Sequence, residues 1–242
     1  MPTSGGTPFR VSRVGRGGGF EGDPWWENAG VVMAPYSPAS PYMVGGILCL
    51  DFCNTTENRT GLPEFHEQLT TYSRLVGFAR QAGLLEEDEL AHLLGRSASQ
   101  PEHAGRTLGE ALQLRETLFR VFNEVAHQRE PFSEDMVELN RLVQRSLSRR
   151  RVERSEAGFE WRWQGKGDSL DCILWPVIES AAELLVGAQT DRIRACEGNC
   201  GYLFLDLSKN RSRRWCLMSV CGARAKNRRH YARTRAARAQ AS

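Results

Sequence analysis

The stretch CEGNCGYLFLDLSKNRSRRWCLMSVC, residues Cys196–Cys221, contains four of the seven cysteines of the chain. They form two pairs, Cys196-x3-Cys200 and Cys216-x4-Cys221, with fifteen residues between the pairs. Two short-range thiol pairs brought together by a hairpin-like excursion supply the tetrahedral set that structural zinc takes. A redox pair would more usually have two intervening residues, and neither pair has that spacing. The sequence therefore predicts one structural Zn²⁺ per chain, held by Cys196, Cys200, Cys216 and Cys221.

A four-cysteine site is closed, because no coordination position remains for a catalytic water. This feature argues against metal-assisted hydrolysis. Glycine follows each pair, at Gly201 and Gly222, where we expect turns that need positive φ. The other three cysteines, Cys49, Cys53 and Cys172, sit among apolar residues and are expected to be buried free thiols.

The chain of 242 residues is long enough for one large domain, or for a medium domain with a small appendage. It has no run of 18 uncharged apolar residues, so no membrane span is predicted. The N-terminus carries arginines but lacks the apolar segment of a secretory signal. We therefore expect a cytoplasmic protein, and a reducing compartment favours metal binding over disulfides for close cysteine pairs.

Charge is distributed unevenly along the chain. From residue 191 to the end there are thirteen Lys and Arg against three acidic residues, a net of +10. The preceding residues hold nineteen basic and twenty-six acidic side chains, a net of −7. An acidic body with a strongly basic tail points to a polyanionic partner for the tail.

The apolar patterning predicts an α+β protein with a mostly helical N-terminal domain and a small antiparallel sheet. Residues 1–42 are rich in Gly, Pro and Ser and are expected to form a disordered leader. Residues 43–188 are predicted to be the acidic body, and residues 189–242 a small zinc finger followed by a basic helix. Within the body we expect a short buried strand, or a turn followed by a strand, at 44–52. We also expect helices at 65–83, 86–96, 107–127 and 133–147, a hairpin at 149–163, and a helix at 169–187 kinked at Pro176.

The cysteine block resembles the bacterial CGNR zinc finger. That pattern joins a cysteine pair, an aromatic-x-Asp-x-Ser segment, an Arg-Trp-Cys-x-Met step and a final Cys-Gly-Asn-Arg. The corresponding residues here are Phe204, Asp206, Ser208, Arg214, Trp215, Cys216, Met218, Cys221, Gly222 and Arg224. Ala223 stands where the family has its asparagine, so a hydrogen bond made by that amide has no counterpart in this chain.

Upstream, LCLDFCNT at Leu48–Thr55, with Arg59 after it, resembles the ABATE domain, which is usually joined to this finger. The ABATE domain is described as a stress-induced transcription regulator, and this role is largely inferred for the members of the family. The two resemblances imply a DNA-binding transcription regulator whose body is a sensor or dimerisation module.

The basic tail is the predicted nucleic-acid interface, with double-stranded DNA as the expected partner. If the segment after Cys221 is helical, Arg224 and Arg228 share a face and are the candidates for entering the major groove. The other basic residues are expected to add DNA contacts, with Lys209, Arg211, Arg213 and Lys226 on phosphates. The full predicted DNA-binding set is Lys209, Arg211, Arg213, Arg214, Arg224, Lys226, Arg228 and Arg229.

In the body, Asp51, Asn54, Thr55 and Arg59 cluster after the predicted strand. They could line a pocket for a small-molecule effector, or they could form a turn whose polar groups satisfy the backbone. The alternating aromatics around Trp161 could form a ligand wall, a homodimer face or ordinary sheet packing.

An enzyme is the competing class of function. The sequence has no G-x-S-x-G elbow, no phosphate-cradling glycine loop after a strand and no H-E-x-x-H pair. We therefore expect a protein that is not an enzyme. The remaining alternatives are an RNA-binding protein and a protein-interaction adaptor with a structural zinc finger.

Overall fold

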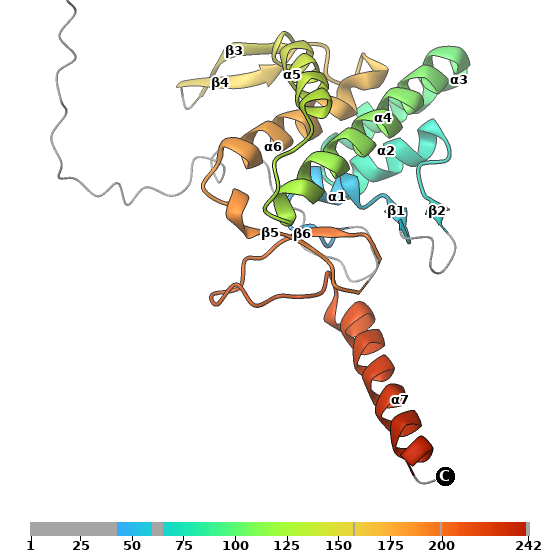
Figure 1. The fold of residues 1–242 in the computed structure, drawn as a ribbon. Helices are drawn as coiled ribbons and strands as arrows, with labels where there is room; N and C mark the ends of the chain where they lie inside the picture. Colours follow the sequence, from blue (N-terminus) through green and yellow to red (C-terminus); the bar gives the residue numbers. More distant parts are fainter. Residues whose placement is uncertain (1–42, 60–64, 157, 199, 241–242) are drawn as a thin grey trace, which may run out of the picture. The chain divides into compact units, whose positions relative to one another are not determined.

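The computed structural model describes residues 43–59, 65–156, 158–198 and 200–240, with side chains described as far as residue 234 (Figure 1). The leader predicted at 1–42 lies outside these residues. The helices of the body are α1 Leu48–Cys53, α2 Tyr72–Gln81, α3 Glu87–Ser99, α4 Pro101–Ala126, α5 Ser133–Leu147, the 3-10 turn η1 Leu170–Ile173 and α6 Leu174–Val186. The finger contains the 3-10 turn η2 Thr190–Arg192, the π-turn η3 Met218–Gly222 and α7 Ala223–Gln240.

The described strands form three two-stranded antiparallel sheets. They pair β1 Thr56–Glu57 with β2 His66–Glu67, β3 Arg150–Ser155 with β4 Gly158–Trp163, and β5 Ile193–Ala195 with β6 Leu203–Leu205. Mostly helical structure with small antiparallel sheets confirms the predicted α+β class. The predicted hairpin is β3–β4, in which Ser155 faces Gly158.

Helix α4 is the centre of the body, as its long apolar stripe predicts. It contacts α1, α2, α3 and α5, and also the strands β5 and β6 of the finger. Its inward face buries Ala111, Leu114, Leu118 and Phe122. The helix begins earlier than the predicted Thr107, because Pro101 occupies the first helical position, where a missing N–H costs nothing.

The strand predicted at residues 44–52 is wrong, since this segment contains a turn followed by α1. A short buried apolar run fits a strand or a buried helix equally well, and periodicity alone cannot separate them. Here Gly46 adopts φ of 77°, and the Asp51 carboxylate accepts a 2.7 Å hydrogen bond from the Gly45 N–H. This bond links the turn to the helix.

Pro176 produces no break in the helix that follows η1. It is the third residue of α6, where the backbone N–H has no intrahelical acceptor in any case. The expected kink is therefore replaced by an N-terminal proline. Helix α5 begins at Ser133, and the residue before it, Phe132, is the N-cap.

Strand β6 lies between two clusters of buried side chains. Leu203 and Leu205 belong to the core of the helical body, together with Ile193 of β5. Phe204, which points the opposite way along the strand, packs with Cys196, Cys216 and Cys221 in the finger's own cluster. Strands β5 and β6, which follow the predicted division at residue 188, therefore contribute side chains to the core of the body.

Asn54 fastens α1 to the same strand. Its amide N–H donates to the Leu203 carbonyl at 2.8 Å, and its side-chain oxygen accepts from the Leu203 N–H at 2.9 Å. Asn54 is fully buried, so no water competes for these bonds.

No helix among the described residues is long and apolar enough to cross a membrane.

We predict that Asn54→Ala lowers the free energy of unfolding by about 3 kcal/mol, because two buried backbone groups of Leu203 lose their partners at about 1–3 kcal/mol each. Urea unfolding of the zinc-loaded chain measures the change. Asn227→Ala, at an exposed position in α7, is the matched control and should change stability by less than about 0.5 kcal/mol. Equal stabilities for the two variants would contradict the fastening role of Asn54.

Candidate metal centre and nucleic-acid interface

The four predicted cysteine ligands meet at one point. Their Sγ atoms all lie within 4.8 Å of one another. Cys200 Sγ is 3.7 Å from Cys216 Sγ, which is 3.6 Å from Cys221 Sγ. Four sulfurs arranged tetrahedrally at about 2.3 Å from zinc are about 3.8 Å apart. The residues therefore fit one structural Zn²⁺, which would be held by Cys196, Cys200, Cys216 and Cys221.

Backbone N–H groups support the metal ligands. Gly198 and Cys216 both donate to the Cys196 sulfur, at 3.4 and 3.3 Å. Hydrogen bonding with Cys200 and the neighbouring thiols lowers the pKa of Cys196, whereas hydrogen bonding with Cys196 raises that of Cys216. The thiols are too close for all four to ionise unless a cation balances them.

Three glycines shape the loop around the sulfurs, each for its own reason. Gly201 has φ of 76°, as predicted from its position after the first pair. Gly222 does not have positive φ, and a Cβ there would lie 2.5 Å from Sδ of Met218, an exposed and flexible side chain that can move aside. Gly198, which the sequence analysis missed, would place a Cβ 2.7 Å from Cys221 Cβ and 2.9 Å from its Sγ.

The loop between the cysteine pairs is held by Asp206 and Arg213. Asp206 is fully buried and accepts from Ser208 Oγ at 2.6 Å and from the Arg213 N–H at 3.1 Å. Burial opposes ionisation, but these hydrogen bonds hold the pKa of Asp206 below its usual value. The Arg213 guanidinium stacks on Phe204 at 4.3 Å and donates to the carbonyls of Val44 and Cys216.

These contacts correct the prediction for Arg213. Its side chain is committed to the interior of the finger, so it is not available as the phosphate contact that the sequence suggested. Arg211 and Arg214 are exposed, but each forms an ion pair, with Asp191 and Glu197 respectively. Trp215 is partly buried against the finger's core.

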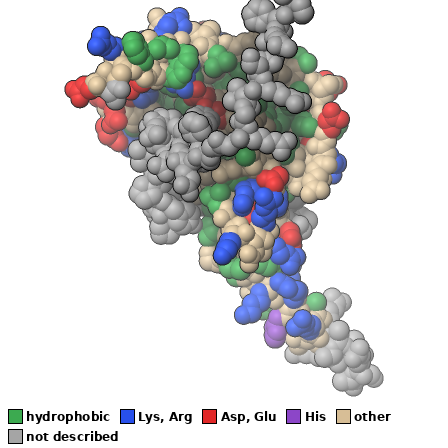
Figure 2. All heavy atoms as spheres, turned by 90° about the vertical axis from the view of Figure 1, so that its left-hand side faces the viewer, with side chains coloured by type: hydrophobic (Ala, Val, Ile, Leu, Met, Phe, Trp, Pro, Cys, Tyr) green, Lys and Arg blue, Asp and Glu red, His purple; other side chains and the backbone are tan. Residues whose placement is uncertain are grey.

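The remaining predicted DNA-binding residues are exposed and make no ion pair within the described residues. Four of them, Arg224, Lys226, Arg228 and Arg229, lie on α7, and Lys209 lies on the loop between the cysteine pairs. From 223 to 234 the helix carries five basic residues and no acidic one. Figure 2 shows Lys and Arg side chains along α7. The structure thus places an array of positive charges without ion pairs on a helix that begins two residues after Cys221.

The cluster Asp51, Asn54, Thr55 and Arg59 is used internally. Thr55 Oγ1 donates to the Phe52 carbonyl at 2.8 Å. Arg59 donates to Glu116 and to the Cys53 carbonyl and stacks on Phe119 at 3.9 Å. Together with the contacts of Asp51 and Asn54 described above, this favours the backbone-satisfying turn over the effector pocket.

Asp51 is buried and has an unusual ionisation. Burial raises its pKa to about 7, although the hydrogen bond from Gly45 and the charge of Arg213 both oppose the rise. In the unfolded chain the same carboxyl ionises near 3.8. Between these pH values the native state therefore holds a proton that the unfolded state has lost, so this group's contribution to stability falls as pH rises from about 4 to 7.

We predict that Asp51→Asn removes this pH dependence, because asparagine can still accept from Gly45 but carries no charge. Between pH 5 and 7 the wild type should lose about 2 kcal/mol of stability relative to Asp51→Asn. Parallel urea titrations of the two proteins measure the difference, and any zinc release is common to both. Parallel stability curves would contradict the raised pKa.

A second prediction concerns Gly198→Ala, which leaves all four ligands in place but crowds Cys221. We expect zinc affinity to fall at least tenfold, measured by competition with a chromophoric chelator, while the wild type binds one zinc per chain. Gly105→Ala is the control, since a Cβ there meets nothing within 4 Å and improves helix propensity by about 1 kcal/mol. Unchanged zinc affinity in Gly198→Ala would contradict the assigned packing.

Two protein-family models match the chain. Residues 46–188, more than half of the sequence, match the ABATE model, described as "Putative stress-induced transcription regulator". Residues 192–234 match the CGNR zinc finger. No individually curated protein matches the sequence. The chain therefore belongs to the ABATE family and carries a C-terminal CGNR zinc finger that holds a four-cysteine metal site.

Proposed function

We propose that this protein is a DNA-binding transcription regulator without enzymatic activity, in which a structural zinc finger orients a basic helix on duplex DNA. The description of the ABATE family supports the regulatory role. The observation that carries the proposal is α7, whose described basic side chains are exposed and unpaired. A cytoplasmic location follows if the target is chromosomal DNA in a bacterium.

The chemistry of α7 suits a polyanion. An isolated array of like charges repels itself and gains most from a ligand that neutralises it, and arginine binds phosphate with two parallel hydrogen bonds. Eighteen residues of helix span about 27 Å, and an α-helix fits the major groove of B-DNA. Arg224 and Arg228, one turn apart, are the candidates for base contacts.

Zinc would act by fixing where this helix begins. Cys221 lies in η3, which runs directly into α7. Arg213 connects the Cys216 carbonyl to the Val44 carbonyl in front of α1. The direction of α7 therefore depends on the metal ligands at its start. Four thiolates leave zinc no position for a substrate, which supports a structural role.

The aromatic side chains favour a duplex over single-stranded RNA. Single-strand recognition uses exposed aromatic rings that stack on bases. Along the described part of α7 the exposed aromatic ring is Tyr231, next to His230, while Trp215 is used in packing. RNA binding and a protein-interaction role are retained as outcomes of the test below.

The body would serve as a sensor or dimerisation module. The β3–β4 hairpin supports dimerisation, because Phe159 and Trp161 are 77% and 62% exposed and Val152 lies opposite Trp161. Large exposed aromatic groups of this kind are common at protein interfaces. This part of the proposal predicts a homodimer in solution.

The test measures binding of the full zinc-loaded chain to a 30-base-pair duplex at several salt concentrations. We predict that the binding constant falls steeply as the salt concentration rises. The slope of log binding constant against log salt concentration should become less steep by about 0.9 for each phosphate contact removed. Replacing Arg224, Lys226, Arg228 and Arg229 with Gln should lower the slope by up to about 3.6, at about 0.9 for each side chain, and affinity by at least a hundredfold. Arg106→Gln, an exposed residue of α4, is the matched control.

Three results would count against this proposal. Equal binding by the quadruple variant would exclude α7 as the interface. Tighter binding to a single-stranded RNA competitor would favour the RNA alternative. Stoichiometric zinc with salt-independent, weak binding to every nucleic acid would favour a protein-interaction adaptor.

A further inference from the structure

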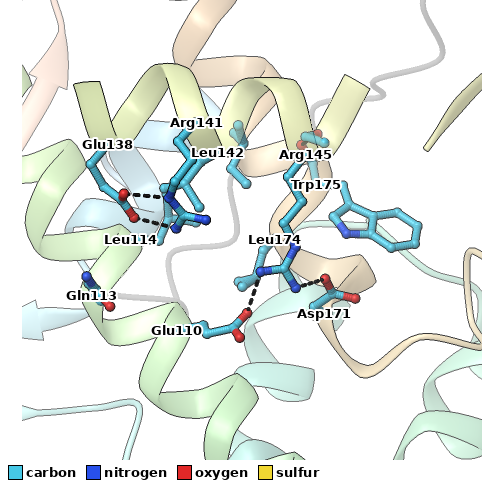
Figure 3. A pocket seen from close by; sticks show the side chains of 12 residues that line it. Glu110, Gln113, Leu114, Glu138, Arg141, Leu142, Arg145, Asp171, Leu174 and Trp175 are labelled. Carbon is cyan, nitrogen blue, oxygen red and sulfur yellow. Dashed lines mark hydrogen bonds and ion pairs between the residues drawn. The ribbon is translucent and has the colours of Figure 1, made fainter. Parts of the chain in front are cut away.

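Exposed arginines of the helical body are neutralised by carboxylates, whereas the described basic side chains of α7 are not. Figure 3 shows Arg141 paired with Glu138, and Arg145 paired with Asp171. Along α7 the described basic side chains are exposed and make no ion pair. From residue 223 to 233 one alanine is half-buried, and every other side chain is exposed. Each side of α7 is therefore accessible to a ligand.

The two sides of α7 differ in chemistry. An α-helix turns about 100° per residue, so one side spans about 100° and carries Arg224, Asn227, Arg228 and Tyr231. The opposite side carries Lys226, Arg229 and Arg233. The side chains of lysine and arginine only donate hydrogen bonds, whereas an amide both donates and accepts them. Asn227 is the one side-chain amide between residues 223 and 234, and it places an acceptor among the donors of the first side.

The amide of Asn227 makes no hydrogen bond among the described residues, and it is exposed. Asparagines on the helices of the body are bonded within the chain. Asn123 Nδ2 donates to Glu124 at 3.2 Å, and Asn140 Nδ2 donates to the Met136 carbonyl at 2.9 Å. Asparagine also favours the helix less than alanine does, because its side chain competes with the backbone. Asn227 therefore does not support α7 itself, and its donor and acceptor are open to an external partner.

A donor and an acceptor on one amide match the edge of one base. In the major groove adenine presents N7 as an acceptor and its N6 amino group as a donor, and an asparagine amide bonds both at once. Guanine presents two acceptors there, which suit arginine. Asn227 lies three residues after Arg224, about 4.5 Å further along the helix axis, and successive bases are about 3.4 Å apart. The two side chains are therefore spaced to reach neighbouring base pairs.

We propose that Asn227 recognises an adenine in the major groove, donating from Nδ2 to N7 and accepting at Oδ1 from the N6 amino group. Arg224 then lies over the adjacent base pair, where it favours guanine. This inference rests on the DNA-binding function proposed above and adds base specificity to it. Because Asn227 carries no charge, it contributes to sequence discrimination and leaves the salt dependence of binding unchanged.

The experiment selects bound sequences from a pool of 30-base-pair duplexes in which the central positions are random. The zinc-loaded wild type, Asn227→Ala and the matched control Asn140→Ala pass through the same selection, and sequencing gives the base preference at each position. We expect the wild type and Asn140→Ala to prefer adenine at one position by about 5- to 100-fold. Asn227→Ala should lose this preference alone, whereas Arg224→Ala should lose the preference at the neighbouring position.

A modified base then tests the atoms of the contact. In the enriched duplex, 7-deazaadenine at the preferred position replaces the N7 acceptor with a C–H group. Binding by the wild type should weaken by about fivefold. Binding by Asn227→Ala should not change, because this variant has no donor for N7. Alanine favours the helix more than asparagine does, so a lost preference does not reflect unfolding of α7.

The outcomes separate this inference from the function on which it rests. Salt-dependent binding without an adenine preference, or with a preference that Asn227→Ala retains, overturns the role of Asn227 and leaves DNA binding by α7 in place. An equal effect of 7-deazaadenine on the wild type and on Asn227→Ala overturns the direct contact. Failure to bind any duplex of the pool overturns both proposals.

Discussion

The finger depends on strand β6, which is shared between two cores. Leu203 and Leu205 fill the core of the helical body, and Phe204 fills the cluster around the cysteines. The Asn54 side-chain amide bonds both the N–H and the carbonyl of Leu203. A strand three residues long makes few ladder hydrogen bonds, so burial on both faces must stabilise it. The metal site is consequently packed against α1 and α4 through this strand pair, and it is not a separate domain on a flexible linker.

A second layer of polar contacts connects the body to the metal ligands. The Asp51 carboxyl holds Gly45, whose carbonyl accepts from the Leu205 N–H at 2.7 Å. The neighbouring Val44 carbonyl accepts from Arg213, which also reaches Cys216. The LCLDF segment thus contacts the finger through a short turn. In this chain, hydrogen bonds therefore join the two matched segments between the start of α1 and the loop that carries the cysteines.

The arginines of the finger and of α7 fall into two classes according to their interaction partners. Those within the cysteine loop are satisfied by carbonyls or carboxylates of the finger itself, and Arg213 is the clearest case. Among the described residues, those on α7 make no ion pair, and Arg229 bonds only the Ala225 carbonyl of its own helix. Sequence composition counts both classes alike, since each adds one to the net charge. Only the surroundings of each guanidinium show which positive charges remain available to a polyanion.

The sequence by itself determined the local features. Cysteine spacing was enough to predict the metal ligands, because four thiols at short range leave few other structures, and helical periodicity predicted α4 and α5. Alternation around Trp161 predicted the β3–β4 hairpin. The tertiary structure decided what depends on neighbours distant in the chain: that residues 48–53 are helical, and that the Arg213 side chain bonds the Val44 carbonyl instead of facing solvent. Local patterns record a residue's own periodicity, whereas burial and hydrogen-bond partners arise from packing between segments as far apart as Asn54 and Leu203.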